Sequence, residues 1–487
     1  MRLKALLKPW IQTITDDCEI TGLQNDSRFI KHGDLFLAYP GAQTDGRHFI
    51  SEAMKAGAHA VLYDALNWTP CVFSPACSGI SIDELEKKLA DIASRFYGEP
   101  TQFLSFTGVT GTNGKTTIAY QLAQAYELLG QSSAYVGTLG QGKPLSLKPL
   151  NNTTPDALVL QALFHQYHNA AIKQVCMEVS SHALTQHRVE HIPFKQAIFT
   201  NLTHDHLDYH QTIEAYAQAK SSLFAIPSLE YAVINQDDVY CSVMKSKTPN
   251  SCQIISYGIH HTADVFVRAW EVNLKGTTME VHSPWGVLTL KINALGFFNL
   301  YNALAIFSSL LVAGYKPDVV VPIMGKLKPA PGRMEVVAQD PTVIVDYAHT
   351  PDALENVLAT LNKLKVGRLL VVFGCGGDRD KLKRPIMGKI ASQYADWVCL
   401  TSDNPRHEDP EQILNEIAVG ISDNTVVERI CDRESAILRA LAVAQKNDIV
   451  VIAGKGHEVY QQIGNQRFPF SDQEIVRHRL TLDQSAH

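Results

Sequence analysis

The strongest chemical signal in this sequence is a glycine-rich stretch that ends in Gly-Lys-Thr-Thr, GVTGTNGKTT at residues 108–117. An apolar run precedes it, and an apolar helical face that ends at Gly130 follows it. Strand, glycine loop and helix in this order are typical of a phosphate site, because the loop N–H groups and the helix N-terminus both attract anions. Lys115 would then contact the outer phosphates of a nucleotide triphosphate, and Thr116 would bind Mg²⁺.

This loop departs from the common phosphate-loop spacing, which has a glycine where this chain has Val109. Gly108 and Gly111 take the place of that glycine. A glycine-rich turn with an incidental lysine is the alternative, but the strand before the loop and the helix after it favour nucleotide binding. The predicted contacts with ATP along the loop are Gly111, Thr112, Asn113, Gly114, Lys115, Thr116 and Thr117.

Two further strand ends supply candidate ligands for the metal. One apolar strand, 172–177, runs into Glu178, and another, 197–200, leads toward His206. Ligands collect at the carboxyl ends of parallel strands, so both side chains should lie near the phosphate loop. A carboxylate there suits Mg²⁺, although a helix N-cap is the alternative for Glu178. For His206 and its neighbours His204 and His210, an ordinary polar loop is an equally good explanation.

The last third of the chain predicts a second binding pocket. Its apolar runs at 342–345, 369–373, 397–400 and 449–452 alternate with helical stretches, as in a doubly wound α/β domain. A polar or glycine-rich loop follows each run, at 346–349, 374–379, 403–406 and 454–458. Four such loops on one sheet edge describe a pocket. Because the loops hold both arginines and carboxylates, the pocket suits a zwitterionic ligand.

The bulk composition sets limits on the class of protein. A chain of 487 residues with 45% hydrophobic and 19% charged residues is expected to form two to four globular domains. A net charge of −6 argues against a nucleic-acid or anionic-membrane surface. Nine scattered cysteines predict neither a disulfide framework nor a zinc site. No run approaches the roughly 20 apolar residues of a membrane span, so a cytoplasmic protein is expected.

The predicted fold class is α/β with three domains. Residues 1–94 should form a small α/β domain, and residues 95–331 a central domain with a P-loop-type doubly wound sheet. Period-two alternation within 257–292 predicts antiparallel strands added to that domain. After them, GFFNLYN at 296–302 opens an apolar helix, and its asparagines either cap that helix or present amides to a purine. Residues 332–487 should form a C-terminal Rossmann-like domain.

Together these motifs resemble the Mur ligases of peptidoglycan synthesis, over essentially the whole chain. The motifs are the glycine loop and the segments 178–182, 201–206, 296–302, 332–335 and 346–352. Asp-Asn-Pro-Arg at 403–406 resembles the signature of the members that add diaminopimelate. Diaminopimelate has a second carboxylate that lysine lacks, and Arg406 can bind it through two hydrogen bonds. Lysine-adding relatives, folylpolyglutamate synthetases and a nucleotide switch without ligase activity are the alternatives.

The resemblance implies an ATP-dependent amide ligase. It would add meso-2,6-diaminopimelate to UDP-N-acetylmuramoyl-L-alanyl-D-glutamate through an acyl phosphate, with Mg²⁺ as cofactor and small molecules as its partners. A monomer is expected. Lys220 would be carbamylated and would help to position Mg²⁺, whereas the alternative for this residue is a solvated helix lysine. The implied catalytic residues are Lys115, Glu178, His206, Lys220 and Arg333. The implied metal ligands are Thr116, Glu178, His206 and carbamylated Lys220.

The resemblance also implies three sets of contacts with substrates. The UDP substrate would contact Asn25, Ser27, Ala42, Gln43, Thr44, Asn152, Thr153, Thr154, Ser180, Gln186 and Arg188. Beyond the glycine loop, ATP would contact Asn302, Arg333, Asp346 and His349. Diaminopimelate would contact Arg379, Asp403, Asn404, Pro405, Arg406, Gly454 and Glu458, the last of which suits its distal ammonium.

Overall fold

The computed structural model describes residues 1–41, 44–69, 73, 77–203, 205–260, 263–422 and 424–485, with side chains described up to residue 481. The chain forms two compact units, Met1–Ser256 and Tyr257–His487. Three residues singled out in the sequence, Ala42, Gln43 and His204, lie outside the described residues. No helix in the described ranges is long and apolar enough to cross a membrane.

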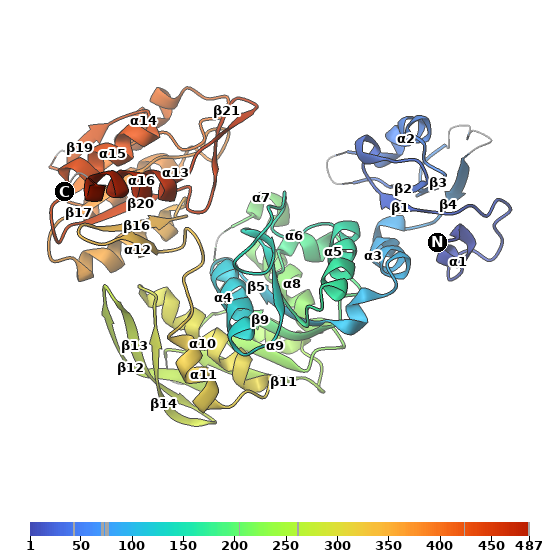
Figure 1. The fold of residues 1–487 in the computed structure, drawn as a ribbon, viewed down its shortest axis with the longest axis horizontal. Coiled ribbons are helices and arrows are strands. Elements are labelled where there is room, and N and C mark those ends of the chain that lie inside the picture. The colour runs from blue at the N-terminus through green and yellow to red at the C-terminus, as the bar shows by residue number, and fades with distance from the viewer. Residues whose placement is uncertain are drawn as a thin grey trace. The chain divides into compact units, whose positions relative to one another are not determined.

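The first unit begins with a small parallel sheet (Figure 1). Its strands, in spatial order, are β1 (Gly22–Gln24), β2 (Asp34–Ala38), β3 (Ala60–Tyr63) and β4 (Ser78–Ser81). Its helices are α1 (Leu3–Leu7), α2 (Ile50–Ala56) and α3 (Leu85–Phe96). Successive strand residues point to opposite faces, so Leu35 and Leu37 join one apolar cluster and Phe36 joins another. Both faces of this sheet are therefore covered.

The larger sheet of the first unit has the spatial order β11-β10-β9-β5-β8-β6-β7. Its strands are β5 (Ser105–Thr110), β6 (Ser133–Gly137), β7 (Gly140–Gly142), β8 (Gln174–Glu178), β9 (Phe194–Phe199), β10 (Tyr231–Asn235) and β11 (Gln253–Gly258). Its helices are α4 (Lys115–Leu128), α5 (Ala157–Asn169), α6 (Ser181–Thr185), α7 (Leu207–His210), α8 (Ile213–Ser221) and α9 (Cys241–Lys247). The central pairs of β5 with β8 and β9 are parallel, as predicted.

The structure corrects the start of the glycine loop. Gly108 belongs to β5, which continues to Thr110, so the loop begins only at Gly111. A Cβ atom at Gly108 would come within 2.9 Å of the Phe194 ring and 3.2 Å of Leu223. Gly108 is therefore a packing glycine inside the sheet, and it does not take the place of a loop glycine at Val109.

The second unit opens with an antiparallel meander, which confirms the period-two pattern. Its strands are β12 (Val265–Asn273), β13 (Gly276–Ser283) and β14 (Gly286–Ile292), and β12 also pairs with Tyr257 and Gly258, the residues of β11 that belong to this unit. Two helices follow, α10 (Phe297–Val312) and α11 (Pro317–Met324). Residues Val267, Met279, Val281 and Leu290 are buried on one face of the meander.

The C-terminal sheet, drawn in orange to red in Figure 1, has the spatial order β15-β16-β20-β17-β18-β19. Its strands are β15 (Glu335–Ala338), β16 (Thr342–Asp346), β17 (Leu369–Phe373), β18 (Trp397–Leu400), β19 (Val426–Arg429) and β20 (Ile449–Ala453), with a separate hairpin of β21 (Tyr460–Ile463) and β22 (Gln466–Pro469). Its helices are α12 (Pro351–Leu364), α13 (Lys383–Tyr394), α14 (Pro410–Ala418), α15 (Arg433–Val443) and α16 (Asp472–Ser485). All its strands except β15 run parallel.

This strand order brings the four predicted loops together. Strands β16, β20, β17 and β18 are consecutive neighbours in the sheet, and each of the four loops follows the carboxyl end of one of them. A buried ion pair also stabilises this edge of the sheet. Arg433 and Asp472 are joined by two hydrogen bonds of 2.8 Å, and Arg433 also donates to Ala453 O at the end of β20, at 3.0 Å. The four loops therefore extend from a firmly held edge of the sheet.

Candidate functional site

The glycine loop, Gly111–Gly114, connects β5 directly to α4. Both of its glycines have a positive φ, 146° at Gly111 and 88° at Gly114. A Cβ atom at Gly111 would lie 1.9 Å from Thr200 Oγ1, so only glycine fits there. Lys115 Nζ donates to the carbonyl oxygens of Gly111 (2.9 Å) and Thr112 (2.8 Å). The ammonium group thus lies over the mouth of the loop, where a phosphate would bind.

The end of β9 holds this loop in shape. Asn201 accepts hydrogen bonds from the backbone N–H groups of Thr112, through its carbonyl at 2.7 Å, and of Asn113, through Oδ1 at 3.0 Å. Thr200 Oγ1 donates to Asn113 O at 2.6 Å. Thr116, on the first turn of α4, is a largely buried residue, and its hydroxyl hydrogen-bonds to no other described residue. That hydroxyl remains available to a metal ion or a phosphate.

Lys220 reaches the same loop from α8 and is only 1% exposed. Its Nζ donates to Gly111 O at 2.8 Å and lies 4.4 Å from the centre of the Tyr216 ring. The alternative of a solvated helix lysine is therefore wrong. Burial lowers the pKa of Lys220 well below its ordinary value, and the nearby ammonium of Lys115 lowers it further, against a weaker opposing effect of Asp205. Two lysines thus converge on one carbonyl oxygen.

Glu178 is the last residue of β8 and pairs in register with Val109, next to the glycine loop. Its Oε1 accepts hydrogen bonds from the Tyr135 hydroxyl and from Thr138 N (2.9 Å), and its Oε2 accepts one from Thr138 Oγ1 (3.2 Å). The carboxylate does not cap α6, because the Ser180 hydroxyl does so. The N-cap alternative for Glu178 is therefore wrong. The carboxylate is buried and held in one orientation at the carboxyl edge of the sheet.

The histidines of the next loop gather into an aromatic cluster. His206 is half exposed and its ring centre lies 4.9 Å from that of His182. His210 is buried, and its Nε2 is 2.9 Å from Ser181 Oγ. Burial, helped by the neighbouring rings of His206 and His210, lowers the pKa of His182 to about 4. Near neutral pH the cluster therefore holds an uncharged imidazole at His182.

A polar network links the residues predicted to bind the muramoyl-peptide part of the UDP substrate. Thr154 Oγ1 donates to Glu178 O (2.9 Å) and accepts from Ser180 N (3.1 Å). Arg188 donates to Thr154 O at 2.8 Å, and also to the side chain of Gln186. Thr153 joins through its hydroxyl, 3.1 Å from that of Thr138. The structure thus brings five of the predicted residues together around Glu178, namely Thr153, Thr154, Ser180, Gln186 and Arg188, whereas Asn152 is exposed.

The residues predicted to bind uridine lie on loops of the first sheet. Asn25 donates to the Tyr39 hydroxyl at 3.2 Å, Ser27 is buried at the start of a short 3₁₀ turn, and Thr44 is exposed. Burial raises the pKa of Tyr39 to about 12, with a weaker lowering effect from Arg188. Tyr39 is therefore a buried hydrogen-bond partner of Asn25 on this part of the first sheet. The sequence did not single out Tyr39.

In the second unit, the predicted ATP contacts Arg333, Asp346 and His349 surround the end of β16. Asp346 accepts hydrogen bonds from Met334 N (2.6 Å) and Ala348 N (2.7 Å), and burial raises its pKa in spite of them. The Arg333 guanidinium stacks 4.3 Å from the centre of the Tyr347 ring, and its buried Nε has no hydrogen-bond partner among the described residues. His349 Nδ1 lies 2.8 Å from Tyr347 O.

The two asparagines that open α10 are both buried. Asn302 Nδ2 donates to Asn299 Oδ1 at 2.9 Å, and Asn299 Nδ2 donates to Leu295 O at 2.6 Å. Neither bond caps the helix, because its N-cap residue is Gly296 and no side chain caps it, so the capping alternative is wrong. The second N–H of the Asn302 amide is still a donor, so contact with a purine stays a prediction.

The predicted diaminopimelate residues converge at the ends of β17, β18 and β20. A Cβ atom at Gly376 would lie 3.0 Å from Arg406 Nη1 and 3.8 Å from Arg379 Cγ, so the side chains of both arginines lie next to this glycine. Arg406 has a φ of 51° and donates from Nη1 to Gly377 O at 2.7 Å. The β21–β22 hairpin holds its backbone through Gln462 O (3.1 Å) and Gly464 N (2.7 Å). The guanidinium is thereby fixed at the pocket.

The acidic side of this pocket comes from Asp403 and Glu458. A Cβ atom at Gly454, whose φ is 114°, would lie 2.6 Å from Asp403 Oδ2, so the loop after β20 approaches this carboxylate closely. Glu458 Oε2 accepts hydrogen bonds from Asn404 Nδ2 (2.8 Å) and from Lys455 Nζ (2.9 Å). Pro405, which lies between Asn404 and Arg406 in the sequence, is buried. The structure therefore joins the basic and acidic residues that the sequence predicted as one pocket.

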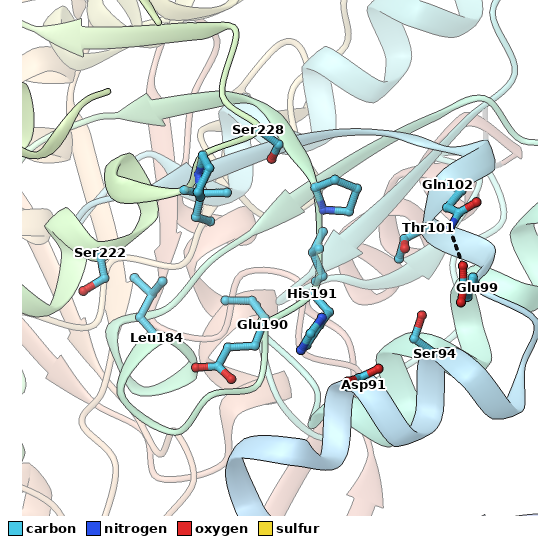
Figure 2. A pocket seen from close by; sticks show the side chains of 15 residues that line it. Asp91, Ser94, Glu99, Thr101, Gln102, Leu184, Glu190, His191, Ser222 and Ser228 are labelled. Atoms are coloured by element: carbon cyan, nitrogen blue, oxygen red, sulfur yellow. Dashed lines mark hydrogen bonds between the residues drawn. The ribbon is translucent and has the colours of Figure 1, made fainter. Parts of the chain in front are cut away.

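A separate pocket of about 720 Å³ lies at the other end of the central sheet. Figure 2 shows Asp91 and Ser94 of α3 and His191, from the segment before β9, along its wall. Its lining belongs to segments near the amino ends of β5, β9 and β10, whereas the glycine loop follows the carboxyl end of β5. No residue predicted to bind a substrate lines this pocket.

Sequence reasoning missed several residues of the site. Tyr135 and Thr138 hold Glu178, but they lie in a different strand and turn, and no local motif marks them. Lys455 is different, because Gly454-Lys455-Gly456 directly after a strand repeats the glycine-lysine pattern of the phosphate loop. That repetition was a usable signal.

Three family models match the chain in succession. The model described as Mur ligase family, catalytic domain matches residues 19–97, the Mur ligase middle domain matches 109–310, and the Mur ligase, glutamate ligase domain matches 332–456. The three-domain α/β fold class is confirmed. The predicted boundaries after residues 94 and 331 stay predictions.

Individual relatives extend over nearly the whole chain. The UDP-N-acetylmuramoyl-L-alanyl-D-glutamate--2,6-diaminopimelate ligase of Chromobacterium violaceum is 42% identical over 467 residues, which cover 95% of this chain and 94% of the relative. The ligase of the same name from Coxiella burnetii is 42% identical, with 98% and 99% covered. A solved structure of a ligase with this name is 37% identical, has a TM-score of 0.73, and covers 100% of this chain and 99% of its own.

Proposed function

Because the chain belongs to the Mur ligase family, we propose that its phosphate loop, the network around Glu178 and its C-terminal pocket serve one ligase reaction. The chain is an ATP-dependent ligase that adds 2,6-diaminopimelate to UDP-N-acetylmuramoyl-L-alanyl-D-glutamate in peptidoglycan synthesis. The observation that carries this proposal is the convergence of Arg406, Asn404 and Glu458 at one sheet edge. Fixed cationic and anionic groups side by side suit a zwitterionic amino acid.

The reaction begins with ATP at the glycine loop. The terminal carboxylate of the UDP substrate attacks the γ-phosphorus, ADP leaves, and an acyl phosphate forms. Lys115 already lies at the mouth of the loop, and it would turn from the carbonyl oxygens of Gly111 and Thr112 to the phosphate oxygens. The stacked guanidinium of Arg333, with its unsatisfied Nε, is a further cation suited to the charge that develops.

The second half of the reaction needs an amine at the acyl carbon. An uncharged amino group of diaminopimelate attacks that carbon, the C–N bond forms, phosphate leaves with the bonding electron pair, and the nitrogen gives up one proton to that phosphate or to water. The C-terminal pocket contributes by orientation: Arg406 would bind the distal carboxylate and Glu458 the distal ammonium. We infer that the meso form is used, that the enzyme acts as a monomer, and that the reaction takes place in the cytoplasm.

The residues at the carboxyl edge of the central sheet fit a magnesium ion. The ion prefers oxygen ligands, and the Thr116 hydroxyl and the Glu178 carboxylate are oxygen donors at this edge, on residues that are 5% and 1% exposed. When bound, Mg²⁺ would supply positive charge next to the phosphates. His206 is a weaker candidate, because it is half exposed and offers nitrogen.

The surroundings of Lys220 support a carbamate. Carbamylation needs a neutral amine that attacks CO₂, and burial together with Lys115 favours the neutral form by lowering the pKa of Lys220. A carbamate would replace a buried cation by an anion beside Lys115 and would add oxygen donors for Mg²⁺. The hydrogen bond from Lys220 to Gly111 O would bring that group directly to the phosphate loop.

Phosphate release from ATP tests the proposed function. With the UDP-muramoyl-dipeptide present, diaminopimelate should stimulate release strongly, whereas L-lysine and L-glutamate should stimulate it far less. Equal stimulation by L-lysine would point to a lysine-adding ligase, stimulation by glutamate would point to folylpolyglutamate-type chemistry, and release that ignores every amino acid would exclude ligase function.

The variant Arg406→Ala tests the pocket itself. We expect kcat/KM for diaminopimelate to fall roughly 100-fold, because one charge-assisted pair with that substrate is lost. The KM for ATP should stay within about twofold, since the loss is confined to one substrate. Arg429→Ala, on the exposed end of β19, is a matched control and should keep both parameters. Equal weakening of ATP and diaminopimelate by Arg406→Ala would make the arginine structural.

A further inference from the structure

Lys455 is a fully buried ammonium group inside the C-terminal pocket, with 0% exposure. It follows β20 and is held by three neighbours. Its Nζ donates to Glu458 Oε2 at 2.9 Å and to Asn404 Oδ1 at 3.1 Å, and it lies 5.4 Å from the centre of the Tyr460 ring. A lysine with this surrounding is not a solvated surface charge. It is part of the wall that carries two of the predicted diaminopimelate contacts.

Lys455 is one of three groups that fix the orientation of the Asn404 side-chain amide. Asn404 Oδ1 accepts from Lys455 Nζ and also from Gln462 N at 2.8 Å, while its Nδ2 donates to Glu458 Oε2 at 2.8 Å. Two donors face one end of the amide, so that end must be the oxygen. Without Lys455, Gln462 N and Glu458 Oε2 would still favour this orientation, but one of the two donors to Oδ1 would be lost.

Lys455 also affects which carboxylate oxygen of Glu458 is available to a ligand. Oε2 is occupied by Lys455 and Asn404, whereas Oε1 forms no hydrogen bond with any residue in the described part of the chain. Oε1 is therefore the oxygen left for an incoming ammonium group. At the same time the Lys455 ammonium offsets the charge of the carboxylate, so the pair as a whole is neutral.

We propose that Lys455 is a specificity-determining positioning residue for diaminopimelate, an inference that rests on the proposed function of this pocket. The far end of diaminopimelate carries a carboxylate and an ammonium and is neutral overall. The far end of L-lysine is a bare ammonium. With Glu458 neutralised by Lys455, a bare ammonium gains little there and meets the fixed cation of Arg406. The zwitterionic end satisfies both partners.

The variant Lys455→Gln leaves the Glu458 carboxylate without its counter-ion. We expect kcat/KM for diaminopimelate to fall roughly 10- to 100-fold, because charge-assisted hydrogen bonds that hold Asn404 and Glu458 are lost. For L-lysine the loss should be smaller, since the freed carboxylate attracts a bare ammonium. The preference for diaminopimelate over L-lysine should therefore fall at least about tenfold, with KM for ATP changed by less than about twofold. Phosphate release with each amino acid measures both.

Two further variants separate charge from packing. Lys455→Arg keeps the charge and should retain most of the preference. The double variant Lys455→Gln with Glu458→Gln removes both charges and should restore the preference over L-lysine, although at lower activity with both amino acids. Lys446→Gln is the matched control, because it removes an exposed lysine at the opposite end of β20. It should change neither activity nor preference.

The outcomes are distinct. Equal loss with diaminopimelate and L-lysine in Lys455→Gln would overturn the proposal and leave Lys455 a structural residue. A preference that stays relaxed in the double variant would overturn the role of charge. Should Lys455→Gln not fold, the double variant and Lys455→Arg still decide, since a relaxed preference in both contradicts the proposal. Lack of preference in the wild-type enzyme would instead contradict the proposed function.

Discussion

Lys220 and Lys455 are two buried lysines whose charged neighbours have opposite signs. Lys220 donates to a carbonyl oxygen and has a second ammonium, that of Lys115, nearby. Lys455 has the carboxylate of Glu458 at 2.9 Å. A buried cation without a carboxylate partner loses its proton more easily. A buried cation that is hydrogen-bonded to a carboxylate instead orients its neighbours. Equal burial therefore supports a reactive amine at one site and a positioning group at the other.

The largest effect should come from removing the unpaired lysine. Lys220→Ala is expected to lower activity roughly a thousandfold, because the proposed carbamate would stabilise charge at the phosphate loop. Short carboxylic acids such as acetate should restore part of the activity, by placing a carboxylate in the vacated space. Phosphate release with and without the acid measures this. The matched control is Lys143→Ala, at an exposed lysine. Failure of every acid would leave the carbamate without support.

The cost of leaving a buried cation unpaired can be measured at Arg433. The variant Asp472→Asn removes its carboxylate partner in a pair that is 0% exposed on both sides. We expect the free energy of unfolding of the C-terminal domain to fall by about 3–5 kcal/mol. Chemical denaturation measures it. Glu428→Gln, in the exposed pair with Arg439, should cost at most about 1 kcal/mol. Similar losses in both variants would remove burial as the explanation.

The smallest effect is the pH dependence of stability that Lys220 imposes. Its pKa is lowered on folding, so below the folded-state pKa both states are protonated and the full destabilisation is present. That destabilisation decreases as the pH rises from the folded-state pKa toward the ordinary value near 10.5. Lys220→Met, which carries no charge, should therefore melt higher than wild type at pH 6 in CO₂-free buffer. The difference in melting temperature between the variant and wild type should become smaller by pH 10. A constant gap would contradict the lowered pKa.

Local patterns were sufficient for most of the secondary structure. The apolar runs at 369–373 and 397–400 are strands with the predicted bounds, and β16 and β20 are each one residue longer than predicted. The exception is Gly108, which the sequence placed in the phosphate loop. A glycine in a loop and a glycine packed against an aromatic ring look alike in one dimension. Only the approach of Phe194 separates them.

The glycine loop, the strand-end carboxylate and the charged loops of the last domain were readable because their chemistry lies within short segments. Which partners each group has was not readable, because those partners come from distant segments. Tyr135 reaches Glu178 across 43 positions and Lys455 reaches Asn404 across 51. Burial and the charged partner together set the charge state of a lysine, and neither can be predicted from the residues next to it in the sequence. The tertiary structure alone therefore distinguishes Lys220 from Lys455.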